Sequence, residues 1–164
     1  MATTYAIPDG RVAMAATTYT GNGGTQAVSN AVNGVSFQPD FVWLKSRSNA
    51  YTHKLYDSVR GITKKLESDS TAAEITTDST FLTSINSGGF TVGSDTGING
   101  SGSTFVGWQW KAGGTAVSNT AGSITSSVSA NTTAGFSVVT YTGTGAVGAT
   151  VGHGLGVAPS LIIQ

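Results

Sequence analysis

The stretch TFVGWQW, residues 104–110, presents two different faces along seven residues. Successive side chains of an extended chain point to opposite sides of a sheet. One face therefore carries Val106, Trp108 and Trp110, and the other carries Phe105, Gly107 and Gln109. This alternation predicts a β-strand in a sheet that is covered on one side.

Similar strand patterns recur at short spacing along the rest of the chain. They lie at residues 41–45, 81–85, 89–92, 136–141 and 161–163. Residues 55–66 also fit an amphipathic helix, because their apolar side chains fall at helical spacing. Gly61 interrupts that pattern, and two short strands around a turn at Arg60-Gly61 are the favoured alternative.

The composition agrees with a β protein. Glycine fills 23 of the 164 positions, serine and threonine fill about 45 more, and only 10% of the residues are charged. The dipeptide Asn-Gly tolerates the positive φ of tight hairpins, so each copy, at residues 22–23, 33–34 and 99–100, can close a two-stranded turn. The chain has no cysteine, which excludes disulfides, a thiolate nucleophile and a Cys-based metal site.

Charged and aromatic residues divide the chain into two regions. Twelve of the sixteen charged residues fall between residues 40 and 78, and none follows Lys111. We therefore predict one β-sandwich over residues 18–112. Residues 113–134, which are rich in Gly, Ser and Thr, form either a linker or a pair of low-contrast strands.

An internal repeat relates the two regions. Residues 19–45 and residues 141–164 share Tyr-Thr-Gly-x-Gly, then a Gly-Val pair, then a proline followed by an apolar segment. The motif predicts a strand, a long Gly-rich connection and a second strand after the proline. Residues 135–164 would then start a second β repeat that stops within a strand, and we expect the chain to be the N-terminal portion of a longer protein.

The patterns that could carry chemistry lack the context that the chemistry requires. Residues 143–149 fit the G-x-G-x-x-G/A pattern of a dinucleotide site, but no helix and no later acidic residue accompany them. His153 is the only His, Asp or Glu after Asp95. The carboxylates available for a glycosidase pair lie among Ser, Thr and Lys, as exposed charges do. They are Asp57, Glu67, Asp69, Glu74 and Asp78.

We therefore predict no catalytic residue, no cofactor and no metal ligand, and we expect the protein not to be an enzyme. The 8 basic and 8 acidic residues give no field that attracts a polyanion, so no nucleic-acid partner is expected. The sequence has no run of eighteen apolar residues, so no membrane insertion is expected either.

Large aromatic side chains offer the remaining candidate binding site. Core packing or subunit contact is the favoured role of the three Trp residues, because they supply much of the area that this chain can bury. A glycan or partner platform is the alternative, since such rings stack on sugars and anchor interfaces. Its candidate residues are Trp43, Arg47, Tyr51, His53, Tyr56 and Arg60.

Six blocks of sequence, taken in order, resemble a family of virion structural proteins of marine tailed bacteriophages, described as tail-fibre or appendage proteins. The blocks lie at residues 37–47, 55–61, 66–68, 70–74, 89–93 and 105–113. The resemblance implies a sandwich of concanavalin, SPRY or jelly-roll type, an N-terminal attachment segment at residues 1–17, and no catalytic motif.

The expected function is therefore that of a non-enzymatic virion protein, most simply a tail-fibre or appendage protein that docks on a tail adaptor or nozzle protein. A capsid decoration protein and a lectin-like module that binds host surface glycan are the alternatives. We expect a homo-oligomer, with a trimer favoured because fibre proteins are commonly trimers. The resemblance implies a location in the virion, after assembly in the cytoplasm of the bacterial host.

Overall fold

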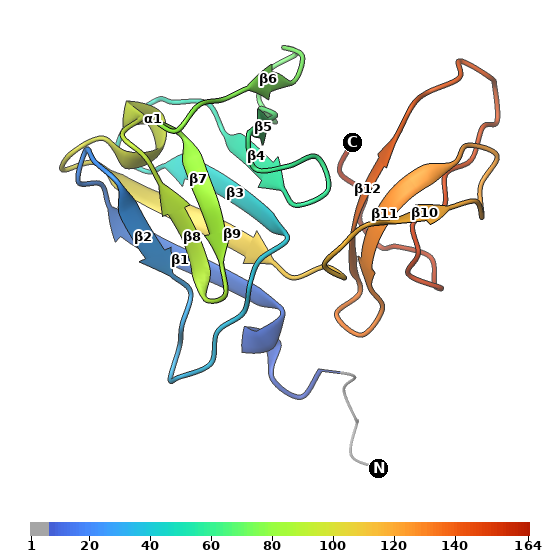
Figure 1. The fold of residues 1–164 in the computed structure, drawn as a ribbon, viewed down its shortest axis with the longest axis horizontal. Helices are drawn as coiled ribbons and strands as arrows, with labels where there is room; N and C mark the ends of the chain where they lie inside the picture. The colour runs from blue at the N-terminus through green and yellow to red at the C-terminus, as the bar shows by residue number, and fades with distance from the viewer. Residues whose placement is uncertain (1–6) are drawn as a thin grey trace.

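Two antiparallel sheets packed face to face make up the larger part of the protein in a computed structural model of the chain, which describes residues 7–164 (Figure 1). The four-stranded sheet has the order β1 (Met14–Thr20), β9 (Thr104–Trp110), β3 (Phe41–Ser46), β4 (Lys54–Asp57). The three-stranded sheet has the order β2 (Gln26–Ser29), β8 (Gly89–Val92), β7 (Leu82–Asn86). The predicted all-β, sandwich-like fold is confirmed.

Short elements complete the sandwich. A 3-10 turn, η1 (Gly10–Val12), precedes β1, and a one-turn helix, α1 (Thr96–Asn99), lies between β8 and β9. The excursion between β4 and β7 contains the two-residue strands β5 (Lys64–Lys65) and β6 (Ile75–Thr76), which pair with each other. No helix in the described part of the chain is long and apolar enough to cross a membrane.

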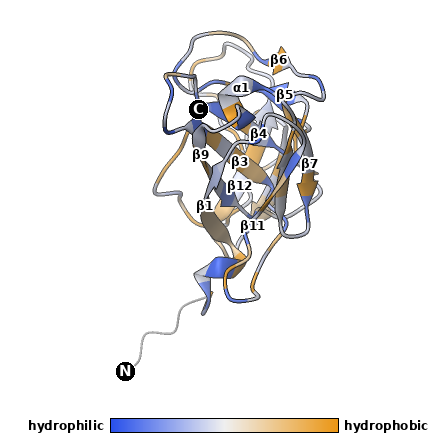
Figure 2. Ribbon diagram, turned by 90° about the vertical axis from the view of Figure 1, so that its left-hand side faces the viewer, coloured by the Kyte–Doolittle hydropathy of each residue, from blue (hydrophilic) through white to orange (hydrophobic). Residues whose placement is uncertain are grey.

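The hydrophobic core lies between the two sheets and contains no Trp. Both sheets and α1 contribute to it, and Figure 2 shows hydrophobic residues on strands such as β3 and β7. Its buried side chains are Val28, Val42, Leu44, Tyr56, Leu82, Phe90, Val92 and Ile98. The tryptophans do not fill this core, so that half of their favoured role is wrong, whereas subunit contact stays a prediction: in the stretch 104–110 the buried face is that of Phe105, Gly107 and Gln109.

Gly107 is needed where the two sheets approach each other. A Cβ at this position would lie 2.9 Å from Cζ of Phe90 and 3.1 Å from Cδ2 of Leu44. Any larger side chain would push the opposite sheet away, because interiors are close-packed.

Buried amides tie the loops to the core. Asn30 Nδ2 donates to the Phe37 carbonyl at 2.9 Å and to Gln109 Oε1 at 3.1 Å. Gln109 Nε2 in turn donates to Thr17 Oγ1 at 3.1 Å. This chain of hydrogen bonds satisfies polar groups that would otherwise destabilise the core, and it links β1 and β9 to the turn that follows β2.

The strand predictions hold for most segments and fail for one. The segments at residues 41–45, 81–85, 89–92, 104–110 and 136–141 are strands in the structure, to within one residue at each end. At residues 55–66 the favoured strand alternative is confirmed by β4 and β5. The prediction for residues 161–163 is wrong: they form no strand and are exposed, because no neighbouring strand pairs with them.

Of the three Asn-Gly dipeptides, only the one at residues 33–34 closes a hairpin. Asn33 and Gly34 have φ of 52° and 80°, and Val32 and Val35 exchange two backbone hydrogen bonds across them. The dipeptide at residues 22–23 instead connects strands of different sheets. Asn99 ends α1, so the hairpin prediction at residues 99–100 is wrong.

A third sheet forms the C-terminal unit, residues 113–164, and stands beside the sandwich (Figure 1). Its strands are β10 (Val117–Asn119), β11 (Ser126–Asn131) and β12 (Phe136–Tyr141), in that order. Residues 113–134 therefore contain strands, which is the second of the two predicted alternatives. The predicted boundary between residues 17 and 18 falls inside β1, and residues 1–6 of the predicted attachment segment lie outside the described residues.

The C-terminal unit packs against the sandwich through aromatic rings, and a hydrogen bond fixes the end of the sandwich just before it. Phe136 stacks on Trp110, with ring centroids 5.9 Å apart and planes at 16°, and also contacts Phe41. The Ala112 amide donates to the buried carboxylate of Asp40 at 2.8 Å. Within the C-terminal unit itself, a Cβ at Gly113 would collide with the Ala130 carbonyl oxygen, so glycine lets the segment after β9 approach β11.

Candidate functional site

The outer face of the four-stranded sheet carries a group of half-buried rings, which we call the aromatic face: Phe41, Trp43, His53, Trp108 and Trp110. Cross-strand register assembles it, because Trp43 lies opposite Trp108, and Phe41 lies opposite Trp110. These positions alternate with the buried positions of β3 and β9, so the face looks away from the core.

Phe136 contacts Phe41 and Trp110, and Trp43 and Trp108 form the part of the aromatic face beyond that contact. Their ring centroids are 6.0 Å apart with planes at 71°, an edge-to-face arrangement that leaves the rings steeply inclined to each other. Trp43 Nε1 donates a 2.7 Å hydrogen bond to His53 Nδ1. A neutral imidazole that accepts at Nδ1 carries its proton on Nε2, which gives the face a hydrogen-bond donor.

Small exposed residues border Trp108 on the other side. β1 places Ala16 opposite Trp108 and Thr18 opposite Val106, and both β1 residues are exposed. Lys45 lies opposite Val106 from β3 and supplies the positive charge in this row. A planar, partly apolar ligand could therefore lie on the small residues of β1 and contact the Trp108 ring, with polar groups at the margin.

The structure brings together only part of the predicted six-residue site. Trp43 and His53 are in direct contact, whereas Arg47 and Tyr51 lie exposed in the loop between β3 and β4. Tyr56 is buried on the opposite face of the sheet, and burial raises the pKa of its hydroxyl. A platform containing Tyr56 is therefore excluded.

Arg60 is also removed from the platform. Its guanidinium pairs with Asp57 at 2.6 Å and with Glu74 at 3.0 Å, so it holds the excursion between β4 and β7. Trp108 was missed as a site residue, although the alternation of residues 104–110 already placed it opposite the Phe105 face. The missing information was the cross-strand register, which brings Trp108 to Trp43.

A buried cluster of charges lies beside the start of β4, next to His53 in sequence. Lys65 Nζ donates to Glu67 Oε1 at 2.8 Å, and this hydrogen bond lowers the pKa of Glu67. Thr52 Oγ1 donates to the same carboxylate and accepts a 3.3 Å hydrogen bond from Lys54 Nζ. Burial lowers the pKa of Lys54, which has no carboxylate within ion-pair distance among the described residues.

Contacts of this kind give a structural role to the carboxylates that the sequence offered for a glycosidase pair. Asp57 and Glu67 are each engaged by a cation, and Asp69 accepts the His53 amide at 3.0 Å. Residues 7–164 contain no group of three His, Cys, Asp or Glu side chains that could hold a metal ion. The structure therefore assigns these charges to the packing of the excursion between β4 and β7.

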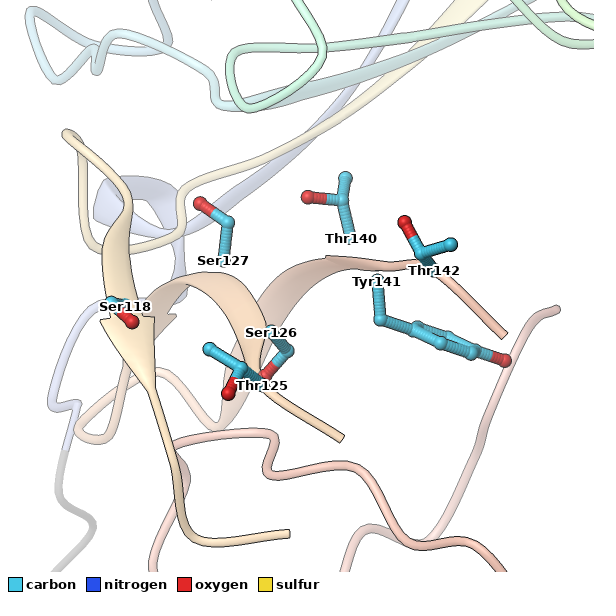
Figure 3. A pocket seen from close by; sticks show the side chains of 7 residues that line it. All are labelled: Ser118, Thr125, Ser126, Ser127, Thr140, Tyr141 and Thr142. Atoms are coloured by element: carbon cyan, nitrogen blue, oxygen red, sulfur yellow. The ribbon is translucent and has the colours of Figure 1, made fainter. Parts of the chain in front are cut away.

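A shallow groove on the C-terminal unit has a volume of about 430 Å³ (Figure 3). Every residue that lines it carries a hydroxyl group. They are Ser118, Thr125, Ser126, Ser127, Thr140, Tyr141 and Thr142. The groove offers neutral hydrogen-bonding groups and one phenol ring but no acid, base or cation, so it can bind neutral polar groups and has no evident chemistry of its own.

Comparison with known proteins gives one match. The sequence model of a family described as "Domain of unknown function (DUF7483)" matches residues 12–164. No curated protein and no solved structure matches the chain.

Proposed function

We propose that this chain, which belongs to the DUF7483 family of domains of unknown function, is a non-enzymatic structural protein of a bacteriophage virion. Within the virion it would be a tail-fibre or appendage protein, in contact with a tail adaptor or nozzle protein. The observation that carries the proposal is the packed succession of two β units, in which Phe136 of the C-terminal unit stacks on Trp110 of the sandwich.

The internal repeat supports a modular appendage. Tyr19 lies at the end of β1 and Tyr141 at the end of β12, and each strand contains or is followed by the same Tyr-Thr-Gly sequence. Both strands are also edge strands with an antiparallel neighbour on one side. A chain that places such units one after another can extend away from a docking point, which suits a protein with a structural role.

Analysis of purified particles tests the proposal. Mass spectrometry of virions from a phage that encodes the chain should detect it at a fixed copy number, and a density map should locate the sandwich on the tail. A position on the coat lattice, at high copy number, would favour the alternative of a capsid decoration protein. Absence of the chain from purified particles would refute both.

The aromatic face favours a second candidate function, that of a lectin-like module for host surface glycan. Trp108 and Trp43 are partly exposed and steeply inclined to each other, and sugar rings stack on such indoles. Thr18 and the His53 donor can reach hydroxyl groups at the margin. The residues of this site are thus Trp43, His53 and Trp108, without Tyr56 or Arg60.

Binding to purified host envelope polysaccharide tests this second function. Trp108→Ala should lower retention at least about tenfold, as loss of an aromatic anchor does. Tyr51→Ala, which removes an exposed ring outside the aromatic face, is the matched control and should leave retention unchanged. Equal retention by Trp108→Ala and the unaltered chain would exclude the aromatic face as a glycan site.

A further inference from the structure

The aromatic face is covered at one end by the C-terminal unit. Phe136 of that unit contacts Phe41 and Trp110, which lie opposite each other in β3 and β9. The next pair along the two strands is Trp43 with Trp108, and both rings are half-buried. A ligand seated on this second pair can therefore extend along the strands in one direction, away from the C-terminal unit.

In that direction the chain places two cations in line with Trp43. Lys45 is the next outward residue of β3 and lies half-buried opposite Val106 of β9. Arg47 follows two residues later and is exposed. Its amide donates to the Thr104 carbonyl at 2.8 Å, so the pairing with β9 continues to this point. Residues two apart in a strand lie on the same side at a distance of about 7 Å, so both cations are within reach of a ligand bound on Trp43.

Hydrogen bonds hold the backbone that carries Arg47. Ser48 Oγ accepts the Thr104 amide at 3.0 Å, and Asn49 Nδ2 donates to Ser103 Oγ at 2.9 Å. These contacts fix the start of the loop between β3 and β4 against the start of β9. The backbone of the cationic positions is thus ordered before a ligand arrives, which lowers the entropic cost of binding.

Neither cation is neutralised by a carboxylate of residues 7–164. Lys45 and Arg47 take part in none of the ion pairs of that part of the chain. Lys45 Nζ donates to the Ser46 carbonyl at 3.0 Å, and an ammonium group has three N–H donors, so two remain for a ligand. Both side chains can therefore pair with an anion that arrives from outside.

The acidic residues near this sheet lie outside the strip from Trp43 to Arg47. The outward positions of β1, β3 and β9 contain no Asp or Glu. Asp57 lies at the covered end of the face, opposite Phe41, and is paired with Arg60. Asp69 accepts the His53 amide just before β4. The strip itself thus carries positive charge next to aromatic rings and no negative charge.

Rings and cations in this order indicate the chemistry of the ligand. Indole rings stack on the apolar face of a sugar, and Lys and Arg side chains pair with carboxylate, phosphate or sulfate groups. We infer that the surface formed by Trp43, Trp108, Lys45 and Arg47 binds an acidic glycan. One sugar ring lies on the two indoles, and the anionic groups of the glycan meet the two cations. The inference rests on the second candidate function, glycan binding, and adds the class of glycan.

A single-stranded nucleic acid also combines flat rings with anions, but the charge of the chain favours a glycan. Proteins hold nucleic acids mainly through many phosphate contacts on a strongly basic surface. This strip offers two cations, and the whole chain has a net charge of zero. The number of cations fits one or two anionic groups on neighbouring sugars better than a phosphate at every nucleotide.

Binding of the full chain to immobilised, purified host envelope polysaccharide tests the inference. Lys45→Met should lower the affinity about fivefold, and the double variant with Arg47→Met should lower it at least about tenfold, as loss of exposed ion pairs does. Lys111→Met removes the same charge from an exposed position outside the aromatic face and should leave the affinity unchanged. Raising the salt concentration from about 0.05 M to about 0.5 M should weaken binding of the unaltered chain and hardly affect the double variant. Circular dichroism checks that each variant is folded.

Chemical reduction of the carboxyl groups of the polysaccharide to alcohols identifies the anion. Loss of binding after reduction assigns it to a carboxylate, and binding that survives reduction but still depends on Lys45 assigns it to a phosphate or sulfate ester. If the double variant binds as well as the unaltered chain while Trp108→Ala binds weakly, the inference fails and the glycan-binding function stands. If the unaltered chain does not bind the polysaccharide, that function fails and the inference fails with it. Equal affinity for single-stranded oligothymidylate would also overturn the inference.

Discussion

Substitution of Asn99 tests how much buried side-chain hydrogen bonds stabilise the sandwich, because three acceptors surround its side-chain nitrogen. Asn99 is fully buried, and its Nδ2 donates to the Gly93 carbonyl at 2.7 Å, to Asn22 Oδ1 at 3.0 Å and to the Gly24 carbonyl. Its Oδ1 accepts the Asn22 amide at 3.1 Å. The side chain thereby fixes the loop after β1 and the end of β8 to α1.

The magnitude follows from these contacts. Asn99→Ala leaves buried acceptors unpaired, and at about 1–3 kcal/mol for each group, with partial relaxation, we expect a loss of about 3–5 kcal/mol in the free energy of unfolding. Asn99→Asp keeps the shape but replaces the donor by an anion that faces carbonyl oxygens. At pH 7 it should cost about 2 kcal/mol more than Asn99→Ala.

Urea unfolding followed by tryptophan fluorescence measures both effects. Burial among oxygens raises the pKa of the introduced carboxyl in the folded state, so protonation favours folding, and the gap between the two variants should narrow as the pH falls toward about 4. Asn131→Asp is the control, because Asn131 uses its Oδ1 to accept the Ala134 amide and a carboxylate can do the same. If Asn99→Asp is no less stable than Asn99→Ala at pH 7, the hydrogen-bond reasoning is refuted.

Three further substitutions probe other contacts. Gly113→Ala should shift the segment after β9 away from β11, because its methyl group would collide with the Ala130 carbonyl; since Phe136 of the same unit stacks on Trp110, a red shift of tryptophan emission without a loss of sandwich stability would confirm this, and an unchanged spectrum would contradict it. Lys54→Met should flatten the rise of stability with pH in the alkaline range. The pKa of Lys54 is lowered by burial, so between that value and its ordinary value the unfolded state binds more protons than the folded state; urea titrations from about pH 7 to 10 decide. Tyr56→Phe should leave the melting temperature unchanged or raise it, because the buried hydroxyl has no partner within hydrogen-bonding geometry, although Thr77 and Leu82 lie nearby; a loss above about 1 kcal/mol would show that it is bonded.

The sequence predicts the strands of the sandwich well because their periodicity is local. The alternation of residues 104–110 is sufficient to place β9, and β8 and β12 match their predicted ranges. It does not show which face of β9 is buried, since both faces carry large apolar residues. The space between the two sheets determines which face is buried. Phe90 of the opposing sheet comes so close to β9 that only a glycine fits at position 107, so the larger Trp side chains lie on the outer face.

The candidate site is less predictable because it depends on pairing between distant strands. Trp43 and Trp108 are 65 residues apart, and only the β3–β9 register brings them together. Tyr56 looked like a neighbour of His53 in sequence, but the strand period sends it into the core. The role of Asn99 could not be predicted for the same reason. The Asn-Gly dipeptide suggests a turn, but the role of the Asn99 side chain is set by three acceptors, on Asn22, Gly24 and Gly93, and two of these are far away in sequence.

The separation of charge along the chain gives the two units different means of stabilisation. The excursion between β4 and β7 exposes most of residues 68–76, so it buries little apolar area there, and the pairs of Arg60 with Asp57 and Glu74 hold it in place. The C-terminal unit has no such pairs, because it has no charged residue, and one of its sheet faces is covered by the segment in which Gly152 accepts the Ser126 hydroxyl. Part of its apolar surface packs on the sandwich, where Phe136 stacks on Trp110. A net charge of zero thus describes two different surfaces: one carries balanced charges, some of them in ion pairs, and the other carries no charge at all.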